Sequence, residues 1–422
     1  MSTPAVDLSP LAVAQLVEAL ARFSGPGPGV TRLAYDEAWC EAQAWLVTQG
    51  RARGLVATRD SAGNLYLHDP ARPPGPIFLT GSHLDTVREG GALDGAYGVI
   101  AGLMLASALR GATRVPVAGL VTCEEEGSRF PTAFLGARAL VGRVARGESD
   151  ALRDEAGVSW REAVTAAAAL GCAAPGGVEK GPTAPQPVAG FLELHIEQGP
   201  VLEAERLDIG IVDRIAGFHR VRVRLTGAAR HAGTTPMRMR RDALAAAAEI
   251  TLAVERIARE HGDPAVATVG AVSAAPGLYN VVAGACELRL DLRQVQAHAL
   301  GRLAYSIEAT ARAIALNRNV GFAWEVVTRQ DPIAMDAGFV DAATRLATER
   351  GIAHRVMSSG AGHDAMILAS AGVPSLMLFV PSQGGVSHHP DELTTPKLLA
   401  GGIEFARALL PALTERVAGS AG

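Results

Sequence analysis

The sequence predicts an α/β protein with two domains, and three observations support that prediction. The chain has 422 residues, more than one ordinary domain usually contains. Short apolar, strand-like runs alternate with helical patterns toward both ends, which is typical of a mostly parallel central sheet flanked by helices. Between these N-terminal and C-terminal parts, the predicted order of strands and helices is instead βαββαβ. We therefore expect one domain built from residues 1–213 and 330–422, with an inserted ferredoxin-like domain at 214–329.

The first domain is expected to begin with two amphipathic helices and a hairpin. Apolar residues recur at helical spacing after Pro10, and the Gly-Pro loop 25–29 ends this helix. A second helix is predicted at 35–48. Alternating strands at 55–58 and 65–68 flank a turn signal, so they predict a hairpin.

The inserted domain is defined by four predicted strands and two predicted helices. The strands are expected at 218–225, 266–273, 285–292 and 321–327, and the helices at 242–260 and 297–314. After this insert, alternation of helix and strand resumes and closes with a helix at 395–410. The insert therefore interrupts the first domain instead of following it.

Polar motifs stand at the ends of four buried, strand-like runs. They are GSHLDT at 81–86, TCEEEGS at 122–128, ELHIEQGP at 193–200 and GVSHHP at 385–390. Sites are usually built where a strand gives way to a loop at the edge of a sheet. The chain therefore concentrates its candidate site residues at strand ends.

A histidine and a carboxylate in the first of these regions form a candidate metal site. His83 and Asp94 are separated by a loop with two glycines and could turn back onto one ion. Taken alone, such a pair is more often a solvated histidine and a helix-capping aspartate than a ligand set. Strand alternation places Glu193, His195 and Glu197 on one face, which adds further ligand types.

Composition and charge exclude several classes of function. A net charge of -4 gives no reason to expect a nucleic acid or an anionic membrane as partner. The four cysteines are widely scattered, which suits reduced thiols better than disulfides or a zinc ribbon. No apolar run of about 18 residues occurs. We expect a cytoplasmic protein.

Six motifs, in order, resemble those of a known family. They are GSHLDT, LDGAYGV, EEEGSRF, ELHIEQGP, RHAGTTPM and SGAGHDAM. From about residue 78 to 392 the chain is similar to the dinuclear-metal M20 peptidase and amidohydrolase superfamily. Within it, the chain resembles the branch of N-carbamoyl-L-amino acid hydrolases, β-ureidopropionases and allantoate amidohydrolases. Any one motif would be weak, but their shared order is specific.

The resemblance implies a catalytic main domain that holds two divalent metal ions, and an insert that acts as lid and dimerisation domain. The implied ligands are His83 and His195 for one ion, Glu126 and His388 for the other, and Asp94 between them. Imidazole and carboxylate ligands suit Zn²⁺, Mn²⁺, Co²⁺ or Ni²⁺ without selecting one. The chain has Ser-His-His-Pro where the family usually carries Ser-His-Asn-Pro, so His389 remains an alternative to His388.

Two carboxylates near the implied ligands are expected to act in catalysis. Glu125 directly precedes a ligand, so it is the expected general base; the alternative is a surface glutamate. Asp85 lies two residues after His83 and is expected to accept that ring's second proton; the alternative is a turn or cap. Glu124 is interpreted as a solvated strand end.

The resemblance also implies substrate-binding residues, most of them in the insert. His231 matches a histidine that reaches the partner subunit's site and stabilises an oxyanion, which implies a homodimer. Asn280 and Arg293 match residues that hold the substrate carboxylate, although Arg293 alone would fit a salt-bridged strand end. Gln198 and the loop 360–364, with Gly362 at its centre, are expected to complete the pocket.

One departure from the branch concerns the start of the insert. Phe218 and His219 stand where many relatives carry Gln-Arg, close to where the branch sets its substrate specificity. We therefore include His219 among the candidate substrate-binding residues, and the acid that is accepted stays open.

The function implied is hydrolysis of the ureido C–N bond of a small, carboxylate-bearing N-carbamoyl amino acid. An allantoate amidohydrolase is the second possibility, because allantoate carries two ureido groups. An M20 aminoacylase or dipeptidase is a third. A metal-poor binding protein of the same fold is a different class, against which the five filled ligand positions argue.

Overall fold

The computed structural model describes residues 6–179 and 181–419. These residues form two compact units. Unit 1 contains the chain up to Asp213, Ala334–Met357 and the chain from His363 onward, and unit 2 contains Arg214–Ile333 with Ser358–Gly362. The expected insert, 214–329, therefore lies inside unit 2.

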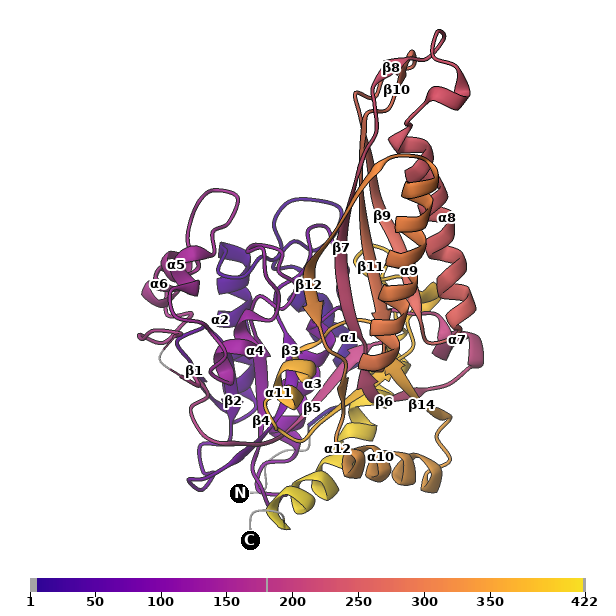
Figure 1. Cartoon of the computed structure of the whole chain (residues 1–422). Helices are drawn as coiled ribbons and strands as arrows, with labels where there is room; N and C mark the ends of the chain where they lie inside the picture. The colour runs from indigo at the N-terminus through magenta and orange to yellow at the C-terminus, as the bar shows by residue number, and fades with distance from the viewer. Residues whose placement is uncertain (1–5, 180, 420–422) are drawn as a thin grey trace. The chain divides into compact units, whose positions relative to one another are not determined.

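The larger sheet has parallel strands at its centre (Figure 1). Its strands are β1 Val56–Arg59, β2 Leu65–His68, β3 Ile77–His83, β4 Val117–Thr122, β5 Val188–Ile196, β6 Ile209–Ile215, β13 Ile333–Ala334, β14 His354–Ser359 and β15 Ser375–Val380. The order is β1-β2-β4-β3-β5-β15-β6-β13, with β14 paired to β6. β3 is parallel to β4 and β5, and β15 is parallel to β5, whereas β2 is antiparallel to β1 and β4. The predicted mostly parallel sheet is confirmed, as is the hairpin.

Helices pack against this sheet because its central strands are mostly apolar. Every residue of β3, β4 and β15 is buried. The helices are α1 Pro10–Ala21, α2 Glu37–Ala52, α3 Ala96–Ala108, α4 Leu135–Leu140, α5 Glu148–Ala151, α6 Trp160–Ala169, α7 Val201–Glu205, α10 Ala337–Glu349, α11 Asp364–Ser370 and α12 Pro396–Gly419. α3 packs against β3 and β4, and α11 packs against β5 and β15. The core is formed where these helices meet the sheet.

Unit 2 has the expected βαββαβ order. Its elements are β7 Gly217–Thr226, α8 Ala243–His261, β9 Val266–Ala275, β11 Ala285–Gln294, α9 Ala297–Asn317 and β12 Gly321–Gln330. The sheet order is β12-β7-β11-β9, all antiparallel. Figure 1 shows α8 and α9 alongside these strands. A small sheet of β8 (Arg230–His231) and β10 (Val281–Val282) adds to the expected elements.

The two faces of the unit 2 sheet differ, as strand alternation requires. Along β7, Val221, Val223 and Leu225 are buried in the core that the helices cover. Arg222 and Arg224, on the other face, form ion pairs with acidic residues of β11 and β12. The helices therefore cover one face, and the other is charged.

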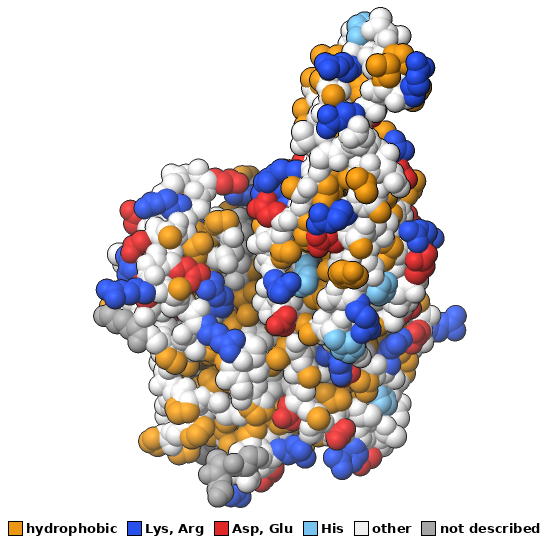
Figure 2. Space-filling view, in the orientation of Figure 1, with side chains coloured by type: hydrophobic (Ala, Val, Ile, Leu, Met, Phe, Trp, Pro, Cys, Tyr) orange, Lys and Arg blue, Asp and Glu red, His pale blue; other side chains and the backbone are white. Residues whose placement is uncertain are grey.

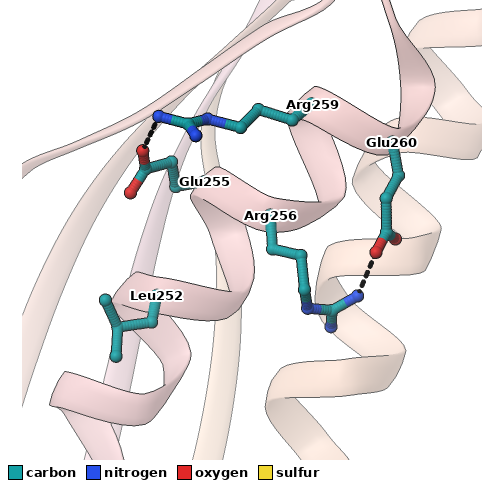
Figure 3. A pocket seen from close by; sticks show the side chains of 5 residues that line it. All are labelled: Leu252, Glu255, Arg256, Arg259 and Glu260. Carbon is teal, nitrogen blue, oxygen red and sulfur yellow. Dashed lines mark hydrogen bonds and ion pairs between the residues drawn. The ribbon is translucent and has the colours of Figure 1, made fainter.

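Unit 2 also has exposed apolar side chains. Figure 2 shows hydrophobic and basic side chains gathered at the end that carries β8 and β10, where Met237 and Tyr279 are exposed. On α8, exposed Leu252 lies beside the ion pairs Glu255–Arg259 and Arg256–Glu260, around a shallow hollow (Figure 3). Among the described residues, no helix has the length and apolarity that a membrane span needs.

Candidate active site

The candidate site of unit 1 forms where parallel strands end together. His83 is the last residue of β3, and His195 is the last but one of β5. The three glutamates 124–126 begin two positions after the last residue of β4, and His388 lies on the loop after β15. Because the four strands run parallel, their carboxyl ends meet at one edge of the sheet.

Asp94 lies between three histidines. Its Oδ1 is 3.4 Å from Nε2 of His83 and 3.1 Å from Nε2 of His195. Its Oδ2 is 3.1 Å from Nε2 of His388, whose Nε2 is also 3.4 Å from Oε1 of Glu126. Burial opposes ionisation of Asp94, but its hydrogen bonds with the three imidazoles outweigh burial and hold its pKa well below the usual range.

Hydrogen bonds set the direction of the two buried imidazoles. Nδ1 of His83 lies 2.9 Å from the carbonyl oxygen of Asp85, and Nδ1 of His195 lies 2.9 Å from that of Ile196. Each ring then donates its Nδ1 proton to a carbonyl and points Nε2 at Asp94, so that a neutral ring would offer its Nε2 lone pair to a metal ion at this place. This arrangement is typical of histidines that bind a metal ion.

The donor atoms fit two divalent ions that share Asp94. One group is His83, Asp94 and His195, and another is Asp94, Glu126 and His388; in each, one ligand atom per residue lies within 4.8 Å of the others. A third group combines His83, Glu125 and Glu126. The two oxygens of Asp94 face different histidines, so its carboxylate belongs to both of the first two groups.

The glycine after Asp94 is required by the close approach of an imidazole. Gly95 precedes α3 with φ 63°, in the left-handed region. A Cβ at this position would lie 2.4 Å from Nδ1 and Cε1 of His83. Any other residue would therefore displace His83 as well as strain the backbone.

Glu125 lies next to the cluster in a buried position. Its Oε2 is 3.9 Å from Nε2 of His83. Burial is the main reason that the pKa of Glu125 is raised well above its usual range; the charge of His83 opposes this, and the charges of Glu126 and Asp364 add to it. A carboxyl group that binds a proton this readily suits proton transfer.

Asp85 makes a different contact from the one expected. The backbone carbonyl of Asp85, and not its carboxylate, accepts the hydrogen bond from His83. The carboxylate accepts hydrogen bonds from the backbone N–H groups of Glu125 and Glu126, each at 3.2 Å. Asp85 therefore holds the backbone that carries the expected base and a ligand.

The expected alternative His389 lies outside the cluster in this structure. Its ring is exposed, and Nδ1 lies 3.6 Å from Oδ2 of Asp391. His388 is the residue that faces Asp94 and Glu126. Gln198 also contacts the cluster, because its Nε2 donates to Oδ2 of Asp94 at 2.9 Å.

The sequence assigned no individual role to two buried acidic residues at the site, Glu193 and Asp364. Glu193 accepts hydrogen bonds from Oγ of Ser82 at 2.7 Å and from the N–H of Ala365 at 2.9 Å. Asp364 accepts a hydrogen bond from Thr122, and burial raises its pKa to about 8. The only sequence signal was strand alternation at Glu193, since the other contacts join distant segments.

Glu392 was not predicted from the sequence, and His363 was expected only as part of the loop 360–364. The ring of His363 lies edge-on to that of His195, with centroids 4.7 Å apart. Glu392 accepts hydrogen bonds from the N–H groups of Leu93 and Asp94. A carboxylate four residues after His388 was a signal that could have indicated Glu392.

In unit 2, His231 and Asn280 lie together on the small sheet. The backbone carbonyl of Asn280 accepts a hydrogen bond from Ala232, and His231 is paired with Val281. Nδ1 of His231 accepts hydrogen bonds from Gly233 and from the next residue at 3.1 and 3.3 Å. A neutral ring with Nδ1 as acceptor carries its proton on Nε2, so this exposed nitrogen is a donor.

Arg293 lies at the opposite end of β11. Its Nε and Nη2 donate to the carboxylate of Asp291 at 2.7 and 3.2 Å, and Nη1 donates to the carbonyl of Gly360 at 2.7 Å. Gly362 belongs to the same short segment, Ser358–Gly362. These contacts use three of the five guanidinium N–H groups.

His219 and Phe218 lie on different faces of β7. His219 has the parity of the core residues of this strand and is buried, and burial lowers its pKa. Phe218 is the register partner of Arg293, whose guanidinium carbon lies 5.7 Å from the Phe218 ring centre. The aromatic residue, and not His219, therefore lies beside Arg293.

The candidate residues of unit 2 are too far apart to meet one small molecule. Val281, the partner of His231, lies 12 positions before Arg293, and the eight positions from Ala285 to Arg293 belong to extended β11. At about 3.3 Å per residue these eight positions alone span roughly 26 Å. Within one unit 2, the structure does not bring His231 and Asn280 to Arg293.

A histidine and carboxylate cluster at the carboxyl ends of parallel strands is typical of hydrolases that use divalent metal ions. The chain belongs to Peptidase family M20/M25/M40, whose family model matches residues 79–412. It is 38% identical over 401 residues to an N-carbamoyl-L-amino-acid amidohydrolase from Paenarthrobacter aurescens, covering 94% of this chain and 96% of the relative. It is 36% identical to an allantoate amidohydrolase from Bacillus subtilis, with coverage of 94% and 96%.

A solved structure supports the same assignment of the fold. The crystal structure of an amidase of the hydantoinase/carbamoylase family from Burkholderia multivorans matches with a TM-score of 0.87 at 30% identity. The match covers 96% of this chain and 98% of that one. Sequence and fold therefore agree over nearly the whole length.

Proposed function

We propose that the chain is an amidohydrolase that cleaves the terminal ureido C–N bond of an N-carbamoyl amino acid. Water adds to the carbamoyl carbon, ammonia leaves, and the resulting carbamate loses CO₂ to free the amine. The observation that carries the proposal is the Asp94 carboxylate shared by two histidine-containing ligand groups. The names of the relatives direct this chemistry to ureido bonds.

We assign the proposed ligands to two divalent ions in each subunit: His83, Asp94 and His195 for the first, and Asp94, Glu126 and His388 for the second. Zn²⁺, Mn²⁺, Co²⁺ and Ni²⁺ all suit these donors. Bound ions polarise the ureido carbonyl and lower the pKa of the attacking water.

Glu125 is the proposed general base. Its position beside His83 lets it take a proton from the attacking water, and its raised pKa lets it retain that proton until the nitrogen departs. Asp85 supports this role because it accepts hydrogen bonds from the backbone of Glu125 and Glu126.

We propose that Arg293 binds the substrate carboxylate. Asp291 and Gly360 orient the guanidinium, and contacts with described residues leave two of its N–H groups for a ligand. Gly362, in the same short segment as Gly360, and Gln198, beside Asp94, are each proposed to contact the substrate, and His219 to act indirectly through β7.

The proposed active enzyme is a homodimer. His231 is proposed to donate its Nε2 proton to the oxyanion, with Asn280 beside it. Because these residues lie at least roughly 26 Å along the strands from Arg293, a second subunit is needed to supply them to the same substrate. The four free, buried cysteines support a reducing compartment such as the cytoplasm.

An allantoate amidohydrolase is the second candidate. Allantoate carries two ureido groups on one carboxylate-bearing carbon, so the same residues would serve. Identities of 36% and 37% to allantoate amidohydrolases from Bacillus subtilis and Escherichia coli favour it nearly as much as the first candidate.

The test is ammonia release by the metal-loaded enzyme from N-carbamoyl-α-amino acids, N-carbamoyl-β-alanine and allantoate. We expect turnover of at least one carbamoyl amino acid, with loss on chelation. Preference for allantoate would establish the second candidate. Turnover of N-acyl amino acids or dipeptides alone would contradict both proposals, and so would the absence of bound metal after reconstitution.

A further inference from the structure

Glu392 joins two segments that carry metal ligands. Its side chain is 6% exposed. Oε1 accepts hydrogen bonds from the backbone N–H groups of Leu93 and Asp94, at 2.8 and 2.9 Å. Oε2 accepts a hydrogen bond from Oγ of Ser387 at 3.0 Å. One carboxylate therefore connects the Asp94 loop to Ser387, the residue next to His388. In the sequence, Glu392 lies 298 positions after Asp94.

Gly91 makes room for this carboxylate. A Cβ at position 91 would lie 2.3 Å from Oε1 and 2.4 Å from Cβ of Glu392, far inside van der Waals contact. The contact can therefore be disturbed from either side, by shortening Glu392 or by adding a methyl group at Gly91.

The two proposed metal positions are not equally anchored. His83 and His195 lie at the ends of buried strands. His388 lies on a loop, its side chain is 50% exposed, and its φ of 55° is in the left-handed region. A ligand on such a loop depends on contacts that hold the loop in place, and Glu392 provides one of them through Ser387.

We propose that Glu392 is a positioning residue that holds the second metal position, formed by Asp94, Glu126 and His388. Its loss empties this position before the one formed by His83, Asp94 and His195. The inference rests on the proposed two-metal site. Removing residues that orient ligands typically lowers metal affinity 10- to 100-fold.

The experiment measures metal stoichiometry in purified, reconstituted protein dialysed against increasing chelator. For Glu392→Ala we expect one ion to be lost at roughly 10- to 100-fold lower free chelator than in wild type, with the other ion retained. Glu392→Gln keeps an acceptor oxygen for the N–H groups of Leu93 and Asp94. It should therefore lose this ion at a free chelator concentration between those of wild type and Glu392→Ala. Gly91→Ala should reproduce the Glu392→Ala result.

Asp391→Ala is the matched control, because Asp391 is an exposed carboxylate in the same loop. It should release both ions as wild type does. The inference would be overturned if Glu392→Ala and Gly91→Ala released both ions together. It would also be overturned if both variants retained their ions as strongly as wild type. If Glu392→Ala fails to fold, Glu392→Gln and Gly91→Ala decide. A wild type that never binds two ions would instead overturn the two-metal proposal.

Discussion

At the scale of single residues, three adjacent glutamates show how surroundings determine what a carboxylate does. Glu124 is buried and accepts hydrogen bonds from the N–H groups of Arg129 and Phe130, so the expected solvated strand end is wrong. Glu125 lies beside His83, and Glu126 faces His388. Of these three neighbours, Glu124 therefore makes structural hydrogen bonds, Glu125 is the proposed base and Glu126 is a proposed metal ligand.

The proposed roles of Glu125 and Glu126 can be separated by isosteric substitution. Glu125→Gln should retain both metal ions and lower kcat by about 10²- to 10⁴-fold, because an amide cannot accept the proton. Glu126→Gln should lose metal. Elemental analysis and steady-state kinetics measure both effects. If Glu125→Gln were the metal-depleted variant, the two assignments would have to be exchanged.

Arg293→Lys tests recognition of the substrate carboxylate. A lysine keeps the charge but lacks the planar fork, so KM for carboxylate-bearing substrates should rise strongly. Removing the carboxylate from the substrate should then harm wild type far more than the variant. Arg289→Lys is the control, since Arg289 is exposed on the same strand. Equal losses in wild type and Arg293→Lys would show that Arg293 does not meet the carboxylate.

At the scale of elements, connections between strands are held by buried or partly buried carboxylates. Asp85 holds the segment after β4, Glu392 holds the segment before α3, and Glu179 holds the start of α5. In each case the acceptor comes from a distant segment. A carboxylate can accept hydrogen bonds from several N–H groups at once. It can therefore order a loop whose backbone is not paired with another strand.

Glu179 should make stability depend on pH. Hydrogen bonds from the hydroxyl of Ser149 and the N–H groups of Gly147 and Ser149 lower the pKa of Glu179 from 4.5 to about 2. A lowered folded-state pKa stabilises the folded protein above the unfolded value, and this contribution is lost as pH falls from about 4.5 toward 2. Glu179→Gln should therefore cost about 1–3 kcal/mol at pH 7 and progressively less below pH 4.5.

Urea unfolding of wild type and Glu179→Gln at pH 7, 5 and 3.5 measures this difference. Glu155→Gln is the control, because Glu155 is 89% exposed in its side chain. A gap between wild type and Glu179→Gln that stayed constant across this range would contradict the assigned linkage.

At the scale of the whole molecule, the length of β11 separates the candidate substrate contacts. His231 and Asn280 lie beyond one end of this strand, and Arg293 lies near the other. A rigid sheet cannot fold back to bring its ends together. A site that needs all three residues therefore needs two subunits, which motivates the proposed homodimer.

Subunit complementation tests this proposal. Glu125→Ala and His231→Ala should each be nearly inactive alone. After joint unfolding and refolding, half of the dimers are mixed and each would have one intact site, so activity should reach about a quarter of wild type in a two-fold dimer. If His231 instead acts within its own chain, every site in the mixture carries one of the two defects. The activity of the mixture then stays at the average of the two variants measured alone.

The reverse mixture gives an independent control. Wild type reassorted with the Glu125→Ala/His231→Ala double variant should keep about a quarter of wild-type activity if sites are shared, because each site of a mixed dimer then has one defect. Sites within one chain would give about half. Mass spectrometry verifies that mixed dimers form in both experiments.

The α/β class, the βαββαβ insert and the residue types at strand ends could all be predicted before the fold was known. These follow from periodicity and short motifs, and each reports interactions between residues close in sequence. The positions of His83, Glu125 and His195 relative to their strands could therefore be predicted from local pattern.

Which side chains contact one another could be seen only in the folded protein. Asp85 binds two backbone N–H groups instead of an imidazole, and Glu392 reaches Asp94 from 298 positions away. The face of β7 occupied by His219 and the distance from His231 to Arg293 likewise emerged only with the sheet. The physical reason is that a buried carboxylate binds whichever donors packing brings to it, and packing joins segments that no local pattern relates.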